Sequence, residues 1–262
     1  MTSRLALVGG GNMGAALLGG LIAAGWAAPH ELAVCEVSAP RRDVLADQFP
    51  GVAVADRVDP CDAAVIAVKP GDVAGAVRDA VAAGASRILS IAAGVSIAAL
   101  EAAAGPGVAV VRSMPNTPAL VGEGAAAIAG GASAGAGDLD WAESILAAVG
   151  IVVRVPEHQL DAVTGLAGSG PAYVFLVAEA LIDAGVLAGL SRQVAESLVT
   201  QTLVGSAALL RDRGDAAQLR AMVTSPGGTT AAGLRRLEEH SVRSAMLEAV
   251  MAATARSREL AG

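Results

Sequence analysis

The sequence feature that most constrains the fold is an apolar run in the middle of the chain, from Ala172 to Leu187. Only Glu179 and Asp183 interrupt it, four residues apart and so on one face of a helix. Pro171 suits the first helical position, where its missing N–H costs nothing. A helix that is apolar almost all round must be buried, so we expect a buried helix of a soluble protein. Membrane insertion is the alternative, and the two carboxylates in mid-segment disfavour it.

The N-terminal part of the chain begins with a glycine-rich turn between a strand pattern and a helix pattern. Residues 4–8 are an apolar strand pattern, GGGNMG occupies positions 9–14, and residues 15–24 have helical spacing. In this context Gly9 permits the tight turn, Gly11 lets the backbone approach a pyrophosphate, and Gly14 lets the helix pack close to the strand. With Asn12 and Met13, whose N–H groups would lie at the helix start, these glycines predict a site for NADPH or NADH.

The end of the second strand pattern, residues 32–36, bears on the choice of cofactor. Glu36 closes this strand, where an acidic side chain would accept hydrogen bonds from the ribose hydroxyls of NADH. Arg41 and Arg42 follow soon after and could instead meet the 2′-phosphate of NADPH, or simply form a solvated helix start. The sequence therefore favours NADH and leaves NADPH open.

Further strand patterns at 52–55, 62–68, 87–91, 108–112, 125–129 and 151–155 alternate with helix patterns at 73–83, from Ser96, and at 138–149. This alternation predicts an α/β fold, a Rossmann-type, mostly parallel sheet. Residues just past the carboxyl end of such strands line the ligand crevice. The expected cofactor contacts there are Ala67, Val68, Lys69, Pro70 and Asn116. The alternative for each is an ordinary turn between a strand and a helix.

The C-terminal part contains only helix patterns, at 191–211, 216–223, 230–240 and 241–260. We place the domain boundary after Pro156, with a dinucleotide-binding Rossmann domain at 1–156 and a helical substrate-binding and dimerisation domain at 157–262. Thin, alanine-rich helices make a poor isolated core. We therefore expect a homodimer through the C-terminal helices; packing against the α/β domain alone is the alternative.

A Pro-Gly-Gly turn within TSPGGTT, residues 224–230, separates two of these helices. Such a turn leading into a helix offers unpaired N–H groups and the positive end of the helix dipole, which suit a carboxylate. The expected substrate-binding residues are Ser225, Gly227, Gly228, Thr229 and Thr230. A capped turn without a ligand is the alternative.

Composition excludes several classes of protein. A net charge of −7 argues against a nucleic-acid or anionic-membrane surface. The histidines show no metal-ligand spacing, so we expect no metal site. We expect Cys35 and Cys61 to be buried free thiols in a reducing compartment. With no signal-peptide pattern at the N-terminus, this predicts a cytoplasmic protein.

Six ordered motifs over nearly the whole chain resemble the pyrroline-5-carboxylate reductase family. They are GGGNMG, AVKP at 67–70, MPNTPALVGEGA at 114–125, AGSGPAY at 167–173, GLSRQVA at 189–195 and SPGGTT at 225–230. The resemblance implies reduction of 1-pyrroline-5-carboxylate to L-proline by hydride from NAD(P)H, the last step of proline biosynthesis. It also implies that the loop at 225–230 holds the substrate carboxylate, that Thr230 acts as the catalytic donor to the ring nitrogen, and that dimers form larger assemblies.

One departure from the resemblance concerns Glu36, because many relatives have a small or amide side chain there; this bears on NADPH preference and not on the reaction. A β-hydroxyacid dehydrogenase is the nearest rival enzyme. That chemistry uses a lysine on the long helix after the Rossmann domain, whereas the only lysine here, Lys69, lies in the sheet domain. A cofactor-sensing protein without turnover is a rival from another class, but it would need no carboxylate-binding loop.

Overall fold

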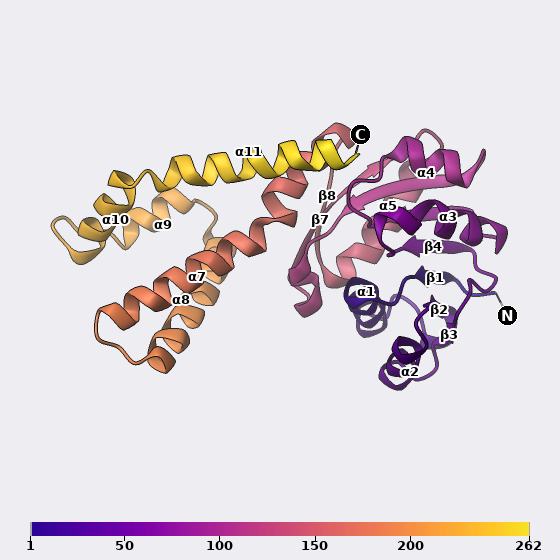
Figure 1. Ribbon diagram of the computed structural model, residues 1–262, viewed down its shortest axis with the longest axis horizontal. Coiled ribbons are helices and arrows are strands. Elements are labelled where there is room, and N and C mark those ends of the chain that lie inside the picture. The colour runs from indigo at the N-terminus through magenta and orange to yellow at the C-terminus, as the bar shows by residue number, and fades with distance from the viewer. Residues whose placement is uncertain (1, 262) are drawn as a thin grey trace. The chain divides into compact units, whose positions relative to one another are not determined.

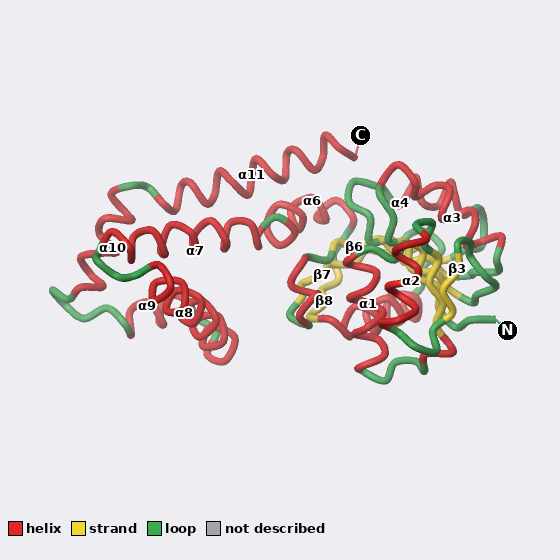
Figure 2. Tube along the Cα trace, turned by 60° about the horizontal axis from the view of Figure 1, so that its bottom comes forward, coloured by secondary structure: helices red, strands yellow, loops and turns green. Residues whose placement is uncertain are grey.

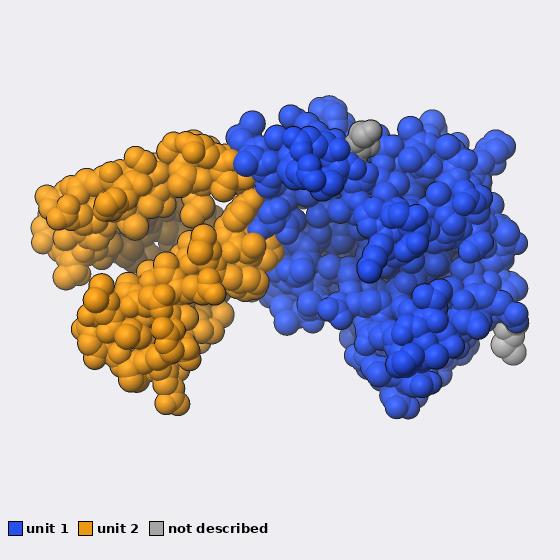
Figure 3. Space-filling model, in the orientation of Figure 1, with its two compact units in different colours: residues 1–169, 251–262 blue, residues 170–250 orange. Residues whose placement is uncertain are grey.

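The computed structural model describes residues 2–261, and the chain divides into two compact units (Figure 3). Unit 1 comprises residues 1–169 and 251–262, and unit 2 comprises residues 170–250. The last helix therefore belongs partly to each unit. The functional boundary after Pro156 stays a prediction.

Unit 1 is built on one eight-stranded sheet with the strand order β3-β2-β1-β4-β5-β6-β7-β8. Its strands are β1 Leu5–Val8, β2 Leu32–Cys35, β3 Ala53–Ala55, β4 Ala63–Ile66, β5 Arg87–Ser90, β6 Ala109–Met114, β7 Gly124–Gly130 and β8 Gly150–Arg154. All neighbours pair in parallel except β6 and β7, which are antiparallel. The predicted Rossmann-type, mostly parallel sheet is confirmed.

The helices of unit 1 cover the two faces of the sheet (Figure 2). They are α1 Asn12–Ala23, α2 Ala39–Gln48, α3 Val73–Ala82, α4 Ile97–Ala104, α5 Ala136–Leu146 and α6 Leu160–Val163. Side chains alternate along each strand. In β1, Leu5 and Leu7 therefore join the core beneath α1, α2 and α5, whereas Ala6 and Val8 face α3 and α4.

The helix pattern predicted from residue 15 begins earlier than expected, at Asn12, directly after the glycine-rich turn. The pattern at 138–149 divides into α5 and a short 3₁₀ turn, Ala147–Val149. The strand expected at 62–68 ends at Ile66, because the chain turns there into a second 3₁₀ segment, Pro70–Asp72. Ser96 caps α4 as predicted, accepting a hydrogen bond from the Ala99 N–H at 3.2 Å.

Unit 2 is wholly helical over its described residues, as predicted (Figure 1). Its helices are α7 Gly170–Leu187, α8 Arg192–Arg213, α9 Ala216–Met222 and α10 Thr229–Glu239, and α11 Val242–Ala261 starts in it. After α7 the chain turns at Gly189, which has a φ of +103°. The Ser191 hydroxyl then accepts a hydrogen bond from the Val194 N–H and caps α8, as the sequence predicts.

The expectation that α7 is buried is wrong for the single chain. None of its residues is buried, and Phe175, Leu176 and Leu187 are among its most exposed side chains. A helix that is apolar almost all round must pack against another surface, but that surface need not belong to the same chain. By length and composition alone the run Glu157–Leu187 could cross a membrane, which is weak evidence because core helices of soluble proteins meet the same criterion.

We predict that Gly14→Ala destabilises unit 1, because a Cβ at this position would lie 2.1 Å from the Gly9 carbonyl oxygen. The expected loss is about 1–3 kcal/mol in the free energy of unfolding, typical of an overpacked site. Gly19→Ala in the same helix is the matched control. Its Cβ would lie 3.4 Å from the Phe49 ring, an ordinary contact, so helix propensity should stabilise it by about 0.5–1 kcal/mol. Urea unfolding of both variants decides; equal midpoints would contradict the close-approach argument.

Candidate active site

The glycine-rich turn holds α1 against the end of β1 and leaves its backbone open to a ligand. Gly9 has a φ of +107°, and a Cβ there would meet the Ala67 carbonyl oxygen at 2.5 Å. At Gly11, in contrast, a Cβ would meet nothing within 4 Å. No side chain within residues 2–261 caps the start of α1, where Asn12 and Met13 are the first helical residues. Open backbone at a helix N-terminus fits the pyrophosphate of a dinucleotide.

Glu36 lies beside this turn and is fixed by backbone donors. Its Oε2 accepts a hydrogen bond from the Gly10 N–H at 2.9 Å, and its Oε1 accepts one from the Ser38 N–H at 2.8 Å. The carboxylate is therefore oriented before any cofactor binds. A carboxylate held at the end of the second strand fits the ribose of a dinucleotide, and this contact stays a prediction.

The two arginines that follow Glu36 are also engaged by the backbone. Arg41 donates from Nε to the Gly10 carbonyl oxygen at 2.7 Å. Arg42 donates from one guanidinium nitrogen to the carbonyl oxygens of Glu36 and Val37, each at 2.9 Å. Neither side chain is simply solvated at the start of α2. Both hold the loop that contains Glu36 in place.

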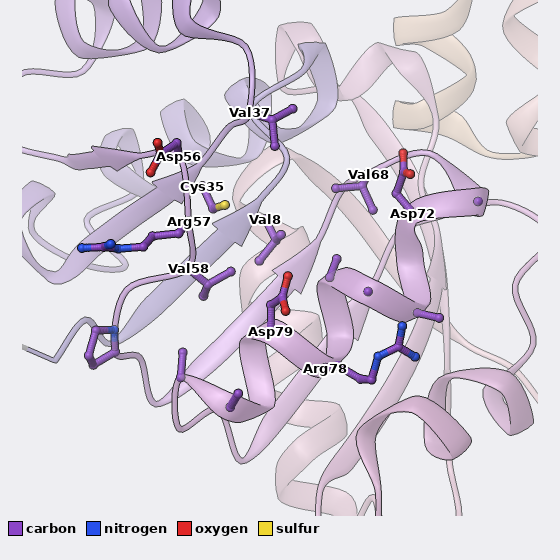
Figure 4. A pocket seen from close by; sticks show the side chains of 17 residues that line it. Val8, Cys35, Val37, Asp56, Arg57, Val58, Val68, Asp72, Arg78 and Asp79 are labelled. Carbon is purple, nitrogen blue, oxygen red and sulfur yellow. The ribbon is translucent and has the colours of Figure 1, made fainter.

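A cavity of about 940 Å³ opens next to this loop on the α3 face of the sheet (Figure 4). It exists because β3 is followed directly by β4, so no helix covers β2 on this side. Val8, Cys35 and Val58 point into it. Gly71 and Gly75 line its α3 side, and a Cβ at either would meet nothing within 4 Å. The open space beside Val37, which has both apolar and charged side chains in its lining, fits the adenosine half of a dinucleotide.

The structure brings Val68 into the lining of this cavity, so one of the four residues predicted after the fourth strand reaches it. Ala67 donates its N–H to the Val8 carbonyl oxygen at 2.7 Å and so lies directly behind the glycine turn. Lys69 and Pro70 are exposed and start the turn before α3. Gly71, in the 3₁₀ segment, and Gly75, in α3, were not predicted from the sequence; the available signal was two glycines four residues apart just after the fourth strand.

Asn116 lies in the loop after β6, with its carboxamide held at both ends by the backbone. Its Nδ2 donates to the Ala167 carbonyl oxygen at 3.0 Å, and its Oδ1 accepts from the Ala125 N–H at 2.8 Å. The predicted contact with the cofactor stays untested. The structure shows that Asn116 connects three segments of unit 1: its own loop after β6, the segment around Ala167, and β7.

In unit 2 the turn before α10 has the form expected of an anion-binding loop. Gly227 has a φ of +70°, and a Cβ on Gly228 would lie 2.5 Å from the Ser225 hydroxyl oxygen. Thr229 and Thr230 form the first turn of α10, and no side chain within the described residues caps it. The N–H groups of Thr229 and Thr230 and the two threonine hydroxyls are thus available to a carboxylate.

The two cysteines are free, and neither is activated. Burial, followed by the charge of Glu36, raises the pKa of the Cys35 thiol to about 11. Burial, followed by Asp62, raises the pKa of Cys61 to about 11. Both thiols are therefore protonated at neutral pH and are poor nucleophiles. Among residues 2–261 no group of three or more His, Cys, Asp or Glu side chains is placed to hold a metal ion.

Comparison with known proteins agrees with this geometry. A family model described as "Pyrroline-5-carboxylate reductase dimerisation" matches residues 157–260, and one described as "NADP oxidoreductase coenzyme F420-dependent" matches residues 4–94. A pyrroline-5-carboxylate reductase of Synechocystis sp. is 45% identical, over 99% of both chains.

Two solved structures extend the likeness to the fold. The pyrroline-5-carboxylate reductase of Coxiella burnetii superimposes with a TM-score of 0.92 at 34% identity, over 100% of both chains. That of Plasmodium falciparum, determined with NADP bound, gives 0.84 at 32% identity, over 99% of this chain and 98% of the other.

The glycine turn, the fixed acidic residue at the end of β2 and the open cavity define the class of protein as an oxidoreductase that uses NAD(P)H. Within this class, similarity over nearly the full length at more than 30% identity settles the family. The chain belongs to the pyrroline-5-carboxylate reductases.

We predict that Glu36→Ala raises the KM for NADH by about tenfold and that for NADPH by less, because charged hydrogen bonds of about 1.5–3 kcal/mol would be lost to the ribose of NADH alone. Initial rates with each cofactor test this. Equal effects on both cofactors would remove Glu36 from cofactor choice.

We predict that Gly75→Leu raises the KM for NAD(P)H by about tenfold with little change in kcat, because the new side chain would fill part of the open cavity. Gly75→Ala is the matched control and should leave the KM near the wild-type value. Unchanged cofactor binding in Gly75→Leu would place the adenosine elsewhere.

Proposed function

We propose that this protein reduces 1-pyrroline-5-carboxylate to L-proline with hydride from NADPH or NADH, the final step of proline biosynthesis. The observation that carries the proposal is the uncapped start of α10 behind the Pro-Gly-Gly turn, with Thr230 in its first turn. A five-membered imine carboxylate offers one anionic group and one ring nitrogen, which match an amide-lined helix start and a hydroxyl donor.

The cofactor is assigned to unit 1, where the residues fit it. The turn Gly9–Gly14, including Asn12 and Met13, binds the pyrophosphate, Glu36 binds the ribose, and the cavity at Val68 and Gly75 takes the adenine. When bound, NAD(P)H supplies the hydride that adds to the C=N carbon. The protein's part is to hold the cofactor and to exclude other reactions.

The substrate is assigned to the loop before α10. The N–H groups of Thr229 and Thr230, with the Ser225 hydroxyl, bind the carboxylate through hydrogen bonds that the positive end of the helix dipole strengthens. Gly228 closes the turn, because its N–H donates to the Ser225 carbonyl oxygen at 3.0 Å. The imine is protonated in solution before it binds, so hydride addition needs no acid from the protein. As hydride adds to the carbon, the π electrons of the C=N bond become a lone pair on the ring nitrogen. The Thr230 hydroxyl is placed to donate a hydrogen bond to that lone pair and so stabilises it as it forms.

The first test is the rate of NADH and NADPH oxidation with and without 1-pyrroline-5-carboxylate. Oxidation that requires the imine, with an equal amount of proline formed, is the expected result. Cofactor binding without oxidation would favour a sensing role. Oxidation with another cyclic imine but not with this one would keep the site and change the substrate.

We predict that Thr230→Ala lowers kcat about 10–100-fold, the effect of losing one hydrogen bond of about 1.5–3 kcal/mol to a charged group. Thr230→Ser keeps the hydroxyl and should restore much of the rate. Fluorescence titration of NADH should give the same Kd for all three proteins. Unchanged turnover in Thr230→Ala would rule out the donor role.

We also propose that the C-terminal helices form the homodimer and that the dimer is cytoplasmic. The apolar side chains that α7 leaves exposed in one chain require a cover, and the match to a dimerisation family over 157–260 favours a second copy over a membrane. The two free cysteines favour a reducing compartment, and the net charge of −7 argues against an anionic membrane surface.

We predict that Val174→Asp weakens the dimer, because burying an unpaired carboxylate in an apolar interface is costly. Val44→Asp on α2 is the matched control, since both valines are 49% exposed in the single chain. Sedimentation at several concentrations should show dissociation of the α7 variant and not of the α2 variant. Identical behaviour of both would exclude α7 from the interface.

A further inference from the structure

The chain passes between the two units twice, after Ser169 into α7 and at Met251 within α11. On the unit 1 side, one short segment, residues 160–169, leads directly into the first passage and contacts the second. This segment consists of α6 and a π-helical turn, Thr164–Gly168. The π turn is closed by the Ser169 N–H, which donates to the Thr164 carbonyl oxygen at 2.8 Å. Such turns are rare in proteins and are frequent at functional sites.

The first passage is fixed by Asn116. Its amide donates to the Ala167 carbonyl oxygen inside the π turn, while its oxygen accepts from the Ala125 N–H of β7. Gly168 lies so close to Met114 of β6 that a Cβ there would come within 2.6 Å of the methionine methyl group. The turn that leads into α7 is therefore attached to the ends of β6 and β7 by one bridging carboxamide and one close packing contact.

The second passage is fixed by Asp161. Its Oδ1 accepts a hydrogen bond from the Ser257 hydroxyl of α11 at 2.7 Å, and Ser257 is buried. Thr254, one turn earlier, is buried as well. On the neighbouring position of α6, Leu160 is fully buried beneath β7 in a small core with Ile97 and Ala127. The last turns of α11 are thus attached to a segment that is itself anchored in the sheet.

We infer that Asn116 and Asp161 are positioning residues for hydride transfer, which they govern by fixing both passages to the cofactor-binding unit. The inference rests on the proposed function. The cofactor site lies on unit 1 and the proposed substrate loop on unit 2, so the distance between donor and acceptor depends on how the passages are held. A misplacement of ~1 Å can lower the rate about 100-fold.

The variants are Asn116→Asp, which cannot donate to the Ala167 carbonyl, and the pair Asp161→Ala and Ser257→Ala. Asp161→Asn keeps an acceptor oxygen and serves as the rescue variant. Ser244→Ala is the matched control, because Ser244 lies on the same helix and donates to the Glu248 carboxylate at 3.0 Å, but within unit 2.

In the wild type, imine-dependent oxidation must first be observed; its absence would refute the proposed function. Given that activity, we expect kcat to fall at least tenfold in the first three variants and the deuterium isotope effect from C4-deuterated NADH to rise, because hydride transfer becomes rate-limiting. The Kd for NADH should stay within twofold. Asp161→Asn and Ser244→Ala should resemble the wild type.

A separate measurement, amide hydrogen exchange in the cofactor-free protein, reports on the two contacts directly. Exchange at 164–169 should be faster in Asn116→Asp, and exchange at 254–261 should be faster in Asp161→Ala and Ser257→Ala.

Unchanged kcat and isotope effect in variants that show the faster exchange would overturn the inference and leave the proposed function intact. A loss of NADH binding in parallel with kcat would also overturn it, since the residues would then act on cofactor binding, Asn116 through its predicted contact, or on the stability of unit 1. The same loss of rate in Ser244→Ala would attribute the effect to α11 in general and not to the contact with Asp161.

Discussion

The cofactor half of this protein depends on one close contact between backbones, that of Gly14 with the carbonyl of Gly9. Only without a Cβ at position 14 can α1 begin so near the end of β1. Because α1 begins there, the Gly10 N–H points to the Glu36 carboxylate and the Gly11 backbone stays open. Three features that a dinucleotide needs, the anion site, the acceptor for ribose and the path between them, therefore follow from a single steric requirement.

The adenosine cavity has a different origin, because it results from a helix that the fold omits. β3 leads straight into β4, so no helix covers β2 on this side. Cys35 therefore lines a cavity together with Val8, which packs against α3. The sequence predicted each strand to within a few residues, since alternating apolar runs and glycine breaks are local signals. The short interval between the third and fourth strands was visible too. The volume left above it was not, because it depends on where Val58 and α3 place their side chains.

Two expectations show where reasoning from the sequence stops. The apolar pattern of α7 correctly predicted a helix, but such a pattern requires only that some surface cover it, and none of its residues is buried in the single chain. Asn116 was assigned to the cofactor because it follows a strand end. That contact stays a prediction, but nothing in the sequence indicated that the amide also meets Ala167 and Ala125, one of them far away in sequence. A polar side chain on a loop has many potential partners, and tertiary packing, which the sequence does not display, selects among them.

The segment at residues 160–169 is held on the sheet by polar contacts as well as by apolar packing. The 3₁₀ turn just before it, Glu157–Gln159, begins with Glu157, which accepts from the Ile97 N–H at 2.7 Å and forms an ion pair with the buried Arg112 at 3.0 Å. Such a pair adds little net stability, because desolvation offsets the attraction, but it admits one geometry. Alanine-rich helices can slide against each other at little cost, since their small side chains interlock poorly. In a protein with few large side chains, directional contacts at Arg112, Asn116 and Asp161 are therefore what can hold this segment in one register on the sheet.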